Sequence, residues 1–379
     1  MRIKWLRGWV ALACAVAGSV SLGTLPGGTV AAADKASSPA APDWDRQAAA
    51  RYLDNREVWW QGWDRAQKDH GTLCISCHTQ APYGLARPVL RPGLHEQEPT
   101  ATEKVMLESI EKRVHLWKDV EAFYPDERYG EGKTVESRNA EAVLNAVLLS
   151  NYDARQGRLG ETTRLAFDHA WALQSTSGPA TGAWVWQNFF YTPWESPESE
   201  YHGAALMAMA VGKAPGGYRD EAKIAANVAA LRGYLKSHYE RQPLLNKVMA
   251  LWASARLPGV LSPAEREGLV KEILSRQRED GGWSLADLGR WERKDSTPLE
   301  TRSDGYATGL TVLALKENRA GNEGVERGIA WLKANQDKAT GAWSGWSLNK
   351  NRDPKSDTGQ FMSDAATGYA VMALEAGSR

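Results

Sequence analysis

Apolar positions recur along most of the chain with helical spacing, and two kinds of helix alternate. In the first kind, apolar residues form a single stripe among charged neighbours, as with Val325, Ile329 and Leu332. In the second kind, exemplified by residues 310–315, apolar or small residues surround nearly the whole helix, which indicates burial on most sides. No competing strand pattern stands out. Six alternations of amphipathic outer and buried inner helices predict an all-α ring of helical hairpins.

Two segments near the C-terminus are close copies of each other. Trp283 and Trp343 lie 60 residues apart, and Asp304 and Asp364 lie 60 residues apart in the same register. A looser third copy contains Trp184. We expect inner helices to start near residues 137, 200, 246, 303 and 363. One step further back lies Cys77-His78, where Pro82 is expected to open the first inner helix and Pro88 to end or kink it.

The N-terminus has the form of a secretory signal peptide. Basic residues Arg2, Lys4 and Arg7 precede an apolar stretch too short for a stable membrane span, and small residues lead up to Ala33. We expect a signal peptide over residues 1–33, a flexible leader over 34–43 and the ring over 44–379, in a periplasmic or secreted protein. An uncleaved anchor is the alternative. The near-neutral charge argues against nucleic-acid binding.

A glutamine precedes each Gly-x-Trp turn, in the pairs Gln174/Trp184, Gln277/Trp283 and Gln336/Trp343. These elements resemble the QW repeats of squalene–hopene and oxidosqualene cyclases, and the inner helices resemble the wider superfamily that includes protein prenyltransferase β-subunits. The resemblance covers roughly residues 100–376. It implies an (α/α)6 toroid with a central cavity lined by the inner helices.

The chain departs from that superfamily at its chemical motifs. The Asp-x-Asp-Asp motif with which such cyclases protonate an alkene is absent. The prenyltransferase zinc set contains a cysteine, and no cysteine remains on the expected inner helices. Cyclase or prenyltransferase chemistry is therefore not expected from the motifs.

Residues 74–78, Cys-Ile-Ser-Cys-His, match the attachment motif of c-type haem. Two thiols separated by two residues can both reach the porphyrin vinyl groups, and the adjacent histidine then becomes an axial ligand. We therefore predict one covalent haem c on Cys74 and Cys77, with His78 on the iron. A redox disulfide between Cys74 and Cys77 and a structural metal site are the alternatives.

The remaining candidates are weaker. His202 is preferred as the second axial ligand because it lies at the start of an inner helix, and the other candidates are His70, His95, His115, His169, His238, Met207 and Met209. Asp304, Asp364 and Glu200 are candidate acid–base residues, although an aspartate before a buried helix is commonly an N-cap.

These features predict an exported haem protein that acts in electron transfer or as an oxidoreductase on a small, apolar or isoprenoid-like substrate. Its partner would be a redox protein or that small molecule. The alternatives are a non-redox enzyme of the toroid superfamily and a toroid that binds a lipid or glycan, with the cysteine pair merely structural.

Overall fold

The computed structural model describes residues 43–377. The predicted signal peptide and nearly all of the predicted leader lie outside the described residues, so cleavage and export stay predictions. None of the helices described is long and apolar enough to span a bilayer.

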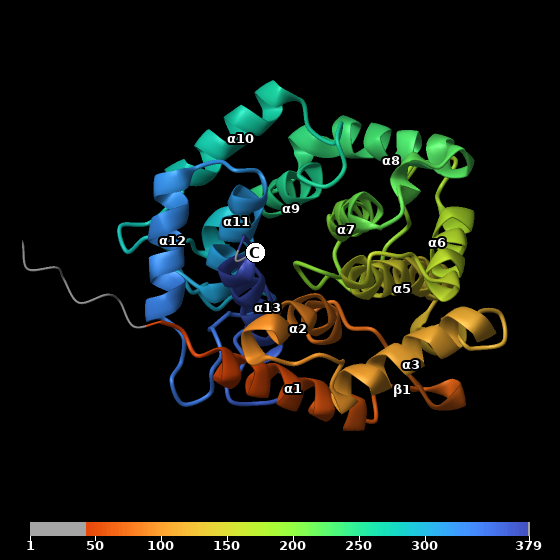
Figure 1. Ribbon diagram of the computed structural model, residues 1–379, viewed down its shortest axis with the longest axis horizontal. Coiled ribbons are helices and arrows are strands. Elements are labelled where there is room, and N and C mark those ends of the chain that lie inside the picture. Colours follow the sequence, from red (N-terminus) through yellow and green to blue (C-terminus); the bar gives the residue numbers. More distant parts are fainter. Residues whose placement is uncertain (1–42, 378–379) are drawn as a thin grey trace, which may run out of the picture. The chain divides into compact units, whose positions relative to one another are not determined.

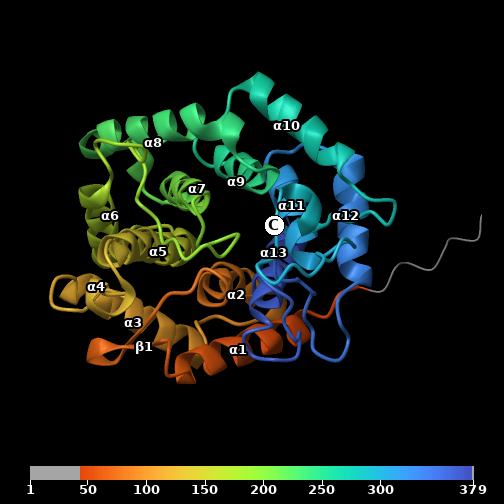
Figure 2. The ribbon, with the colours of Figure 1, turned by 180° about the vertical axis from the view of Figure 1, so that it is seen from behind.

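In the described part of the chain, twelve long helices form two concentric layers, which Figure 1 shows down the axis and Figure 2 shows from behind. The outer helices are α1 (Arg46–Gly62), α3 (Ala101–Leu116), α6 (Glu161–Leu173), α8 (Ala225–His238), α10 (Pro263–Ser275) and α12 (Asn322–Ala334). The inner helices are α2 (Gln80–Leu94), α5 (Lys133–Gln156), α7 (Ser199–Lys213), α9 (Leu244–Ser254), α11 (Gly305–Glu317) and α13 (Phe361–Glu375). Outer and inner helices alternate strictly along the chain.

The inner helices close into a ring because α13, the last of them, packs against α2, the first. Each other inner helix packs against the inner helices before and after it in the chain. The predicted all-α (α/α)6 toroid is therefore confirmed. Besides the twelve helices, the described residues form a short α-helix, α4 (Asp126–Tyr129), and an antiparallel hairpin of β1 (Gln67–Lys68) and β2 (Thr72–Leu73).

The Gln–Trp elements join neighbouring hairpins by one recurring set of hydrogen bonds. The Nε2 of Gln277 donates to the carbonyls of Gly281, in its own turn, and Gly324, at the start of the next outer helix. The indole of Trp283 is buried and donates to the carbonyl of Ile273. The same bonds recur in the elements Gln174/Trp184 and Gln336/Trp343. These residues are therefore structural, as buried tryptophans with a hydrogen-bonded N–H commonly are.

The first inner helix differs from its prediction. It begins at Gln80, two residues before Pro82, and it continues through Pro88 and Pro92 as far as Leu94. Pro88 was predicted to end or kink this helix, and the helix does not end there. Packing of α2 against α1, α5 and α13 holds the helix together despite the two missing N–H donors.

Candidate functional site

A cavity of about 590 Å³ opens where the inner helices α2 and α13 begin. Its walls come from segments far apart in the chain: the end of α1, the residues before α2, the loop before α7 and the residues that lead into α13. The aromatic residues that line it are Trp60, Trp63, Tyr124, Tyr129, Tyr191, Trp194 and Phe361. The shape and lining are those of a small-molecule site.

Cys74, Cys77 and His78 all line this cavity. The β1–β2 hairpin holds the segment, since the N–H of Cys74 donates to the carbonyl of Ala66 and the indole of Trp60 donates to the carbonyl of Cys74. The hydroxyl of Ser76 accepts from the N–H groups of Thr79 and Gln80 and so caps the entry to α2. The motif therefore lies at the head of the first inner helix, where the repeat register placed it.

Burial keeps both thiols protonated. It raises the pKa of Cys74 to about 12 and raises the pKa of Cys77 as well. Both cysteines are free thiols, so the structure contains no Cys74–Cys77 disulfide. Among the described residues no cluster of three or more His, Cys, Asp or Glu side chains could hold a metal ion.

His78 is enclosed by aromatic rings. Its imidazole stacks on Phe361, with ring centroids 3.7 Å apart, and meets the edge of Trp60 at 5.3 Å. Burial lowers the pKa of His78 to about 3, so the ring is neutral at ordinary pH. Its Nδ1 lies 2.9 Å from the hydroxyl of Thr79. Within the described part of the chain, Nε2 has no hydrogen-bond partner.

The placement of these residues fits the predicted haem in one respect, because both thiols and the imidazole line a single cavity. A bound haem would supply an iron centre for redox chemistry, with Cys74 and Cys77 as attachment points and His78 as ligand. No contact in the structure tests it, so the covalent haem stays a prediction.

Glu195 is a site residue that sequence analysis missed. It lies in the loop between α6 and α7, where it pairs with Tyr191 across a backbone bridge, and it lines the cavity. Its carboxyl forms no ion pair with any described residue. Burial raises the pKa of Glu195 to about 7, against a weaker opposing effect of the Lys133 ammonium. A half-buried carboxyl that holds its proton near neutral pH is suited to general acid catalysis.

Four cationic side chains also line the cavity, namely Arg65, Lys68, Arg128 and Arg352. None of them forms an ion pair with a described residue. Asp64 and Glu195 are the acidic residues of the lining, so cations predominate. Unpaired guanidinium and ammonium groups in a cavity favour an anionic ligand, and arginine in particular favours a carboxylate or phosphate.

The other predicted residues lie elsewhere. Asp304 is the N-cap of α11, accepting from the N–H of Ala307, as its position suggested. Asp364 is not an N-cap, because it lies inside α13 and pairs with Arg56. Glu200 accepts from the hydroxyl of Tyr234. His202 is buried in α7, and none of these four lines the large cavity. The distal-ligand assignment of His202 therefore stays a prediction.

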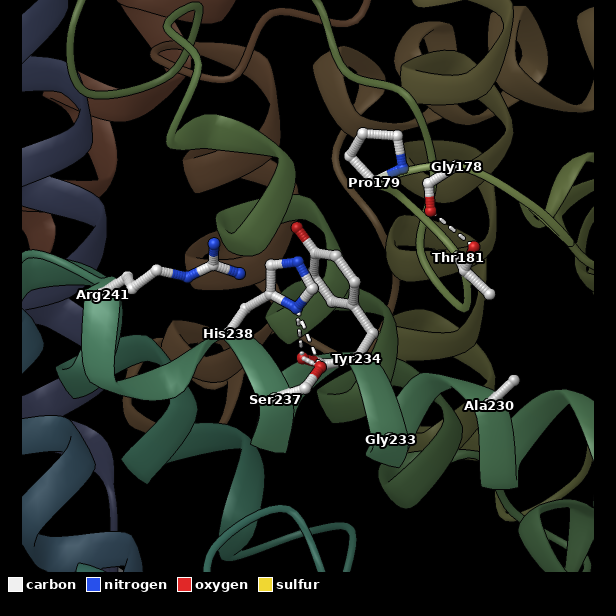
Figure 3. A pocket seen from close by; sticks show the side chains of 9 residues that line it. All are labelled: Gly178, Pro179, Thr181, Ala230, Gly233, Tyr234, Ser237, His238 and Arg241. Carbon is white, nitrogen blue, oxygen red and sulfur yellow. Dashed lines mark hydrogen bonds between the residues drawn. The ribbon is translucent and has the colours of Figure 1, made fainter.

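A second, more open pocket of about 570 Å³ lies on the outer helix α8 (Figure 3). In this pocket, the imidazole of His238 stacks on the ring of Tyr234, with ring centroids 4.2 Å apart. The Nδ1 atom of His238 contacts the Ser237 hydroxyl and the Tyr234 carbonyl (Figure 3). No carboxyl group lines this pocket. The larger cavity therefore offers the better candidate site.

No family model matches the chain, and no curated protein of similar sequence was found. Solved structures do share its fold. An unsaturated glucuronyl hydrolase from Bacillus sp. GL1, responsible for glycosaminoglycan degradation, superposes with a TM-score of 0.53 and 9% identity, over 87% of this chain and 96% of that one. A possible GH105 family member from Klebsiella pneumoniae has a TM-score of 0.44 and 11% identity, over 87% of this chain and 92% of that one.

These comparisons correct the functional prediction. The sequence predicted a haem protein with a terpene-cyclase-like toroid fold, acting in electron transfer or as an oxidoreductase. The Bacillus protein whose fold it shares is instead an unsaturated glucuronyl hydrolase. The toroid was inferred correctly from the repeats, but the cyclase resemblance and the haem function were not supported.

Proposed function

We propose that the protein is a glycoside hydrolase whose large cavity binds an acidic carbohydrate, with Glu195 as the proton donor. The observation that carries this proposal is the Glu195 carboxyl, which lines the cavity without an ion-pair partner and has its pKa raised to about 7. Such a group is protonated in a large fraction of molecules at neutral pH and can protonate a glycosidic oxygen.

The cavity walls suit a sugar that carries a carboxylate. Aromatic rings offer apolar faces on which the flat side of a pyranose ring can pack. Arg65, Lys68, Arg128 and Arg352 offer unpaired cations for an anionic substituent. The Bacillus protein of the same fold is an unsaturated glucuronyl hydrolase, and a glucuronyl sugar has both a pyranose ring and a carboxylate.

The loop that carries Glu195 is anchored on two sides. Asn349 donates its Nδ2 to the carbonyl of Thr192 at 2.7 Å, and the indole of Trp186 donates to the carbonyl of Trp194 at 3.0 Å. These bonds fix the backbone on the N-terminal side of Glu195 before substrate arrives, and a fixed backbone favours a well-positioned proton donor.

The test is turnover of glucuronyl disaccharides, saturated and unsaturated, beside the matching glucosyl disaccharides. We expect activity on the acidic sugars, and we expect Glu195→Gln to lower kcat/KM by roughly 10²–10⁴-fold because an amide cannot donate the proton. Glu198→Gln changes an exposed glutamate three residues away and should leave the rate unchanged.

Absorbance spectra of the same purified protein test for the alternative occupant of the cavity, the haem predicted from the sequence. A covalent porphyrin absorbance that survives denaturation, together with no activity on any acidic sugar, would overturn the glycosidase proposal. Full activity of Glu195→Gln would overturn the role of Glu195.

A further inference from the structure

We propose that the rim of the large cavity carries a second binding surface, which holds sugar units beyond the one that is cleaved, so that the preferred substrate is an acidic oligosaccharide chain. This surface, the rim platform, consists of Tyr129, Phe190 and Tyr191 with the cations Arg128 and Lys294. The inference rests on the proposed function for the identity of the ligand, whereas the platform itself follows from exposure and contacts.

The exposed aromatic side chains of the protein gather at this cavity. Among the described residues three are exposed, and of these Tyr129 and Tyr191 line the cavity while Phe190 directly precedes Tyr191. The ring of Phe190 is 66% exposed, that of Tyr191 41% and that of Tyr129 39%. Single exposed apolar residues are ordinary on a protein surface, whereas a group of them beside a cavity marks a binding surface.

Hydrogen bonds hold the loop that presents Phe190. The N–H of Asn188 donates to the carboxylate of Glu136, and the carbonyl of Asn188 accepts from Lys133 at 2.6 Å. The side-chain oxygen of Asn188 accepts from the N–H of Phe190 at 3.0 Å. Phe190 takes a left-handed φ of 59°, which is uncommon for a bulky residue, so this conformation depends on the surrounding bonds. A ring that is held in position before the ligand arrives loses little conformational entropy on binding.

The platform is continuous with the proposed proton donor. Tyr191 and Glu195 exchange two backbone hydrogen bonds of 2.8 Å each, so the two residues face each other across the loop. Directly paired residues of this kind have Cα atoms about 4.5–5.5 Å apart. A chain whose glycosidic oxygen lies at Glu195 therefore brings its next unit to Tyr191.

Cations flank the exposed rings. The ammonium of Lys294 lies 4.0 Å from the centroid of the Tyr191 ring and donates to the carbonyl of Phe189 at 3.3 Å. Arg128 precedes Tyr129 in α4 and lines the cavity. Neither Lys294 nor Arg128 forms an ion pair with a described residue. Aromatic faces beside unpaired cations suit a chain whose sugar units offer apolar faces and carboxylates.

Calorimetry on the Glu195→Gln protein tests the platform, because this variant should bind chains without cleaving them. The probes are glucuronic-acid-containing oligosaccharides of two and six sugar units, with glucose oligosaccharides of the same lengths as neutral controls. We expect the six-unit acidic chain to bind roughly tenfold more tightly than the two-unit chain, and the glucose chains to show a smaller gain. Equal affinities of the two acidic probes would overturn the inference.

Two substitutions at exposed positions, each added to Glu195→Gln, locate the gain. Phe190→Ser should bring the ratio of the six-unit to the two-unit affinity close to one, and Lys294→Gln should lower this ratio for the acidic chains alone. Val105→Ser changes another exposed apolar residue, on the outer helix α3, and should keep the ratio of its parent. Unchanged ratios in both platform variants would sink the proposal.

Sedimentation of the wild type and of Phe190→Ser examines the other occupant that exposed rings could have, a second copy of this chain. We expect both proteins to be monomers at the concentrations used for calorimetry. A wild-type dimer that dissociates in Phe190→Ser, together with an unchanged affinity ratio, would assign the rings to self-association and contradict the platform.

Activity separates this inference from the proposed function. If the wild type cleaves the acidic disaccharide and its kcat/KM does not rise with chain length, the inference fails and the proposed function stands. If longer acidic chains bind more tightly through Phe190 and Lys294 while the wild type cleaves none of them, the proposed function fails and the platform stands as a binding surface.

Discussion

At the scale of single residues, the proposed acid makes a prediction about pH. The pKa of Glu195 lies at about 7, and only the protonated carboxyl can donate. We therefore expect kcat/KM on the acidic disaccharide to be level below pH 6 and to fall about tenfold per pH unit well above pH 7. A rate that rises through pH 7 would contradict the assignment. The residual kcat/KM of Glu195→Gln should not show this fall above pH 7.

A second buried carboxyl affects stability rather than activity. Glu57 in α1 accepts from Gln61 and Gln80 on one oxygen, and its other oxygen has no partner among residues 43–377. Burial raises the pKa of Glu57 from 4.5 to about 8. Between about pH 4.5 and pH 8, Glu57 therefore holds a proton in the folded protein that it has lost in the unfolded chain. Because of this difference, the free energy of unfolding falls as the pH rises through that range.

Glu57→Gln removes this effect. In urea unfolding, the free energy of unfolding of Glu57→Gln relative to that of the wild type should increase by roughly 1–3 kcal/mol from pH 6 to pH 8.5. A difference that is constant with pH would show that Glu57 does not titrate in this range.

Sequence reasoning singled out residues of a motif that line the large cavity, and it missed a lining residue that belongs to no motif. Cys74, Cys77 and His78 were found because their spacing is itself a signal. Glu195 lies in a loop without periodicity, and its environment comes from the fold. Asp304 and Asp364 share one place in the repeat, yet one caps a helix and the other pairs with Arg56 from α1.

At the scale of elements, the small residues of the inner helices set how closely those helices approach. A Cβ at Gly309 in α11 would lie 2.6 Å from the backbone nitrogen of Ala370 in α13. Gly309→Ala should therefore lower the free energy of unfolding by about 1–3 kcal/mol.

Gly233 provides the matched control, because it lies within the outer helix α8 and a Cβ there would meet nothing within 4 Å. Gly233→Ala should raise stability by about 0.5–1 kcal/mol through its higher helix propensity. Equal effects of the two substitutions in chemical denaturation would contradict this account of the inner ring. The repeat pattern predicted these buried helices, and their observed starts lie within a few residues of the expected ones.

At the scale of the whole molecule, Gln336 joins the last hairpin to the first. Its side chain accepts from the N–H of Asp45 at 2.7 Å and donates to the carbonyls of Asp45 and Gly341. Gln336→Ala should lower the free energy of unfolding by about 1–3 kcal/mol and speed amide exchange in the first turn of α1. Lys338→Ala, at an exposed position in the same turn, should change neither quantity.

Ring closure also assembles the cavity, which explains why sequence analysis did not find it. Arg65, Arg128 and Arg352 are dispersed over the chain and share no motif. They line one cavity because α13 returns to α2. Their common preference for an anion is therefore a property of the closed toroid.

The most direct test of the central claim is a crystal structure of the Glu195→Gln protein soaked with an unsaturated glucuronyl disaccharide. The account predicts the sugar in the large cavity, its carboxylate against Arg65, Lys68, Arg128 or Arg352, and its glycosidic oxygen within hydrogen-bond distance of residue 195. A cavity without sugar, or one filled by a porphyrin bonded to Cys74 and Cys77, would contradict it.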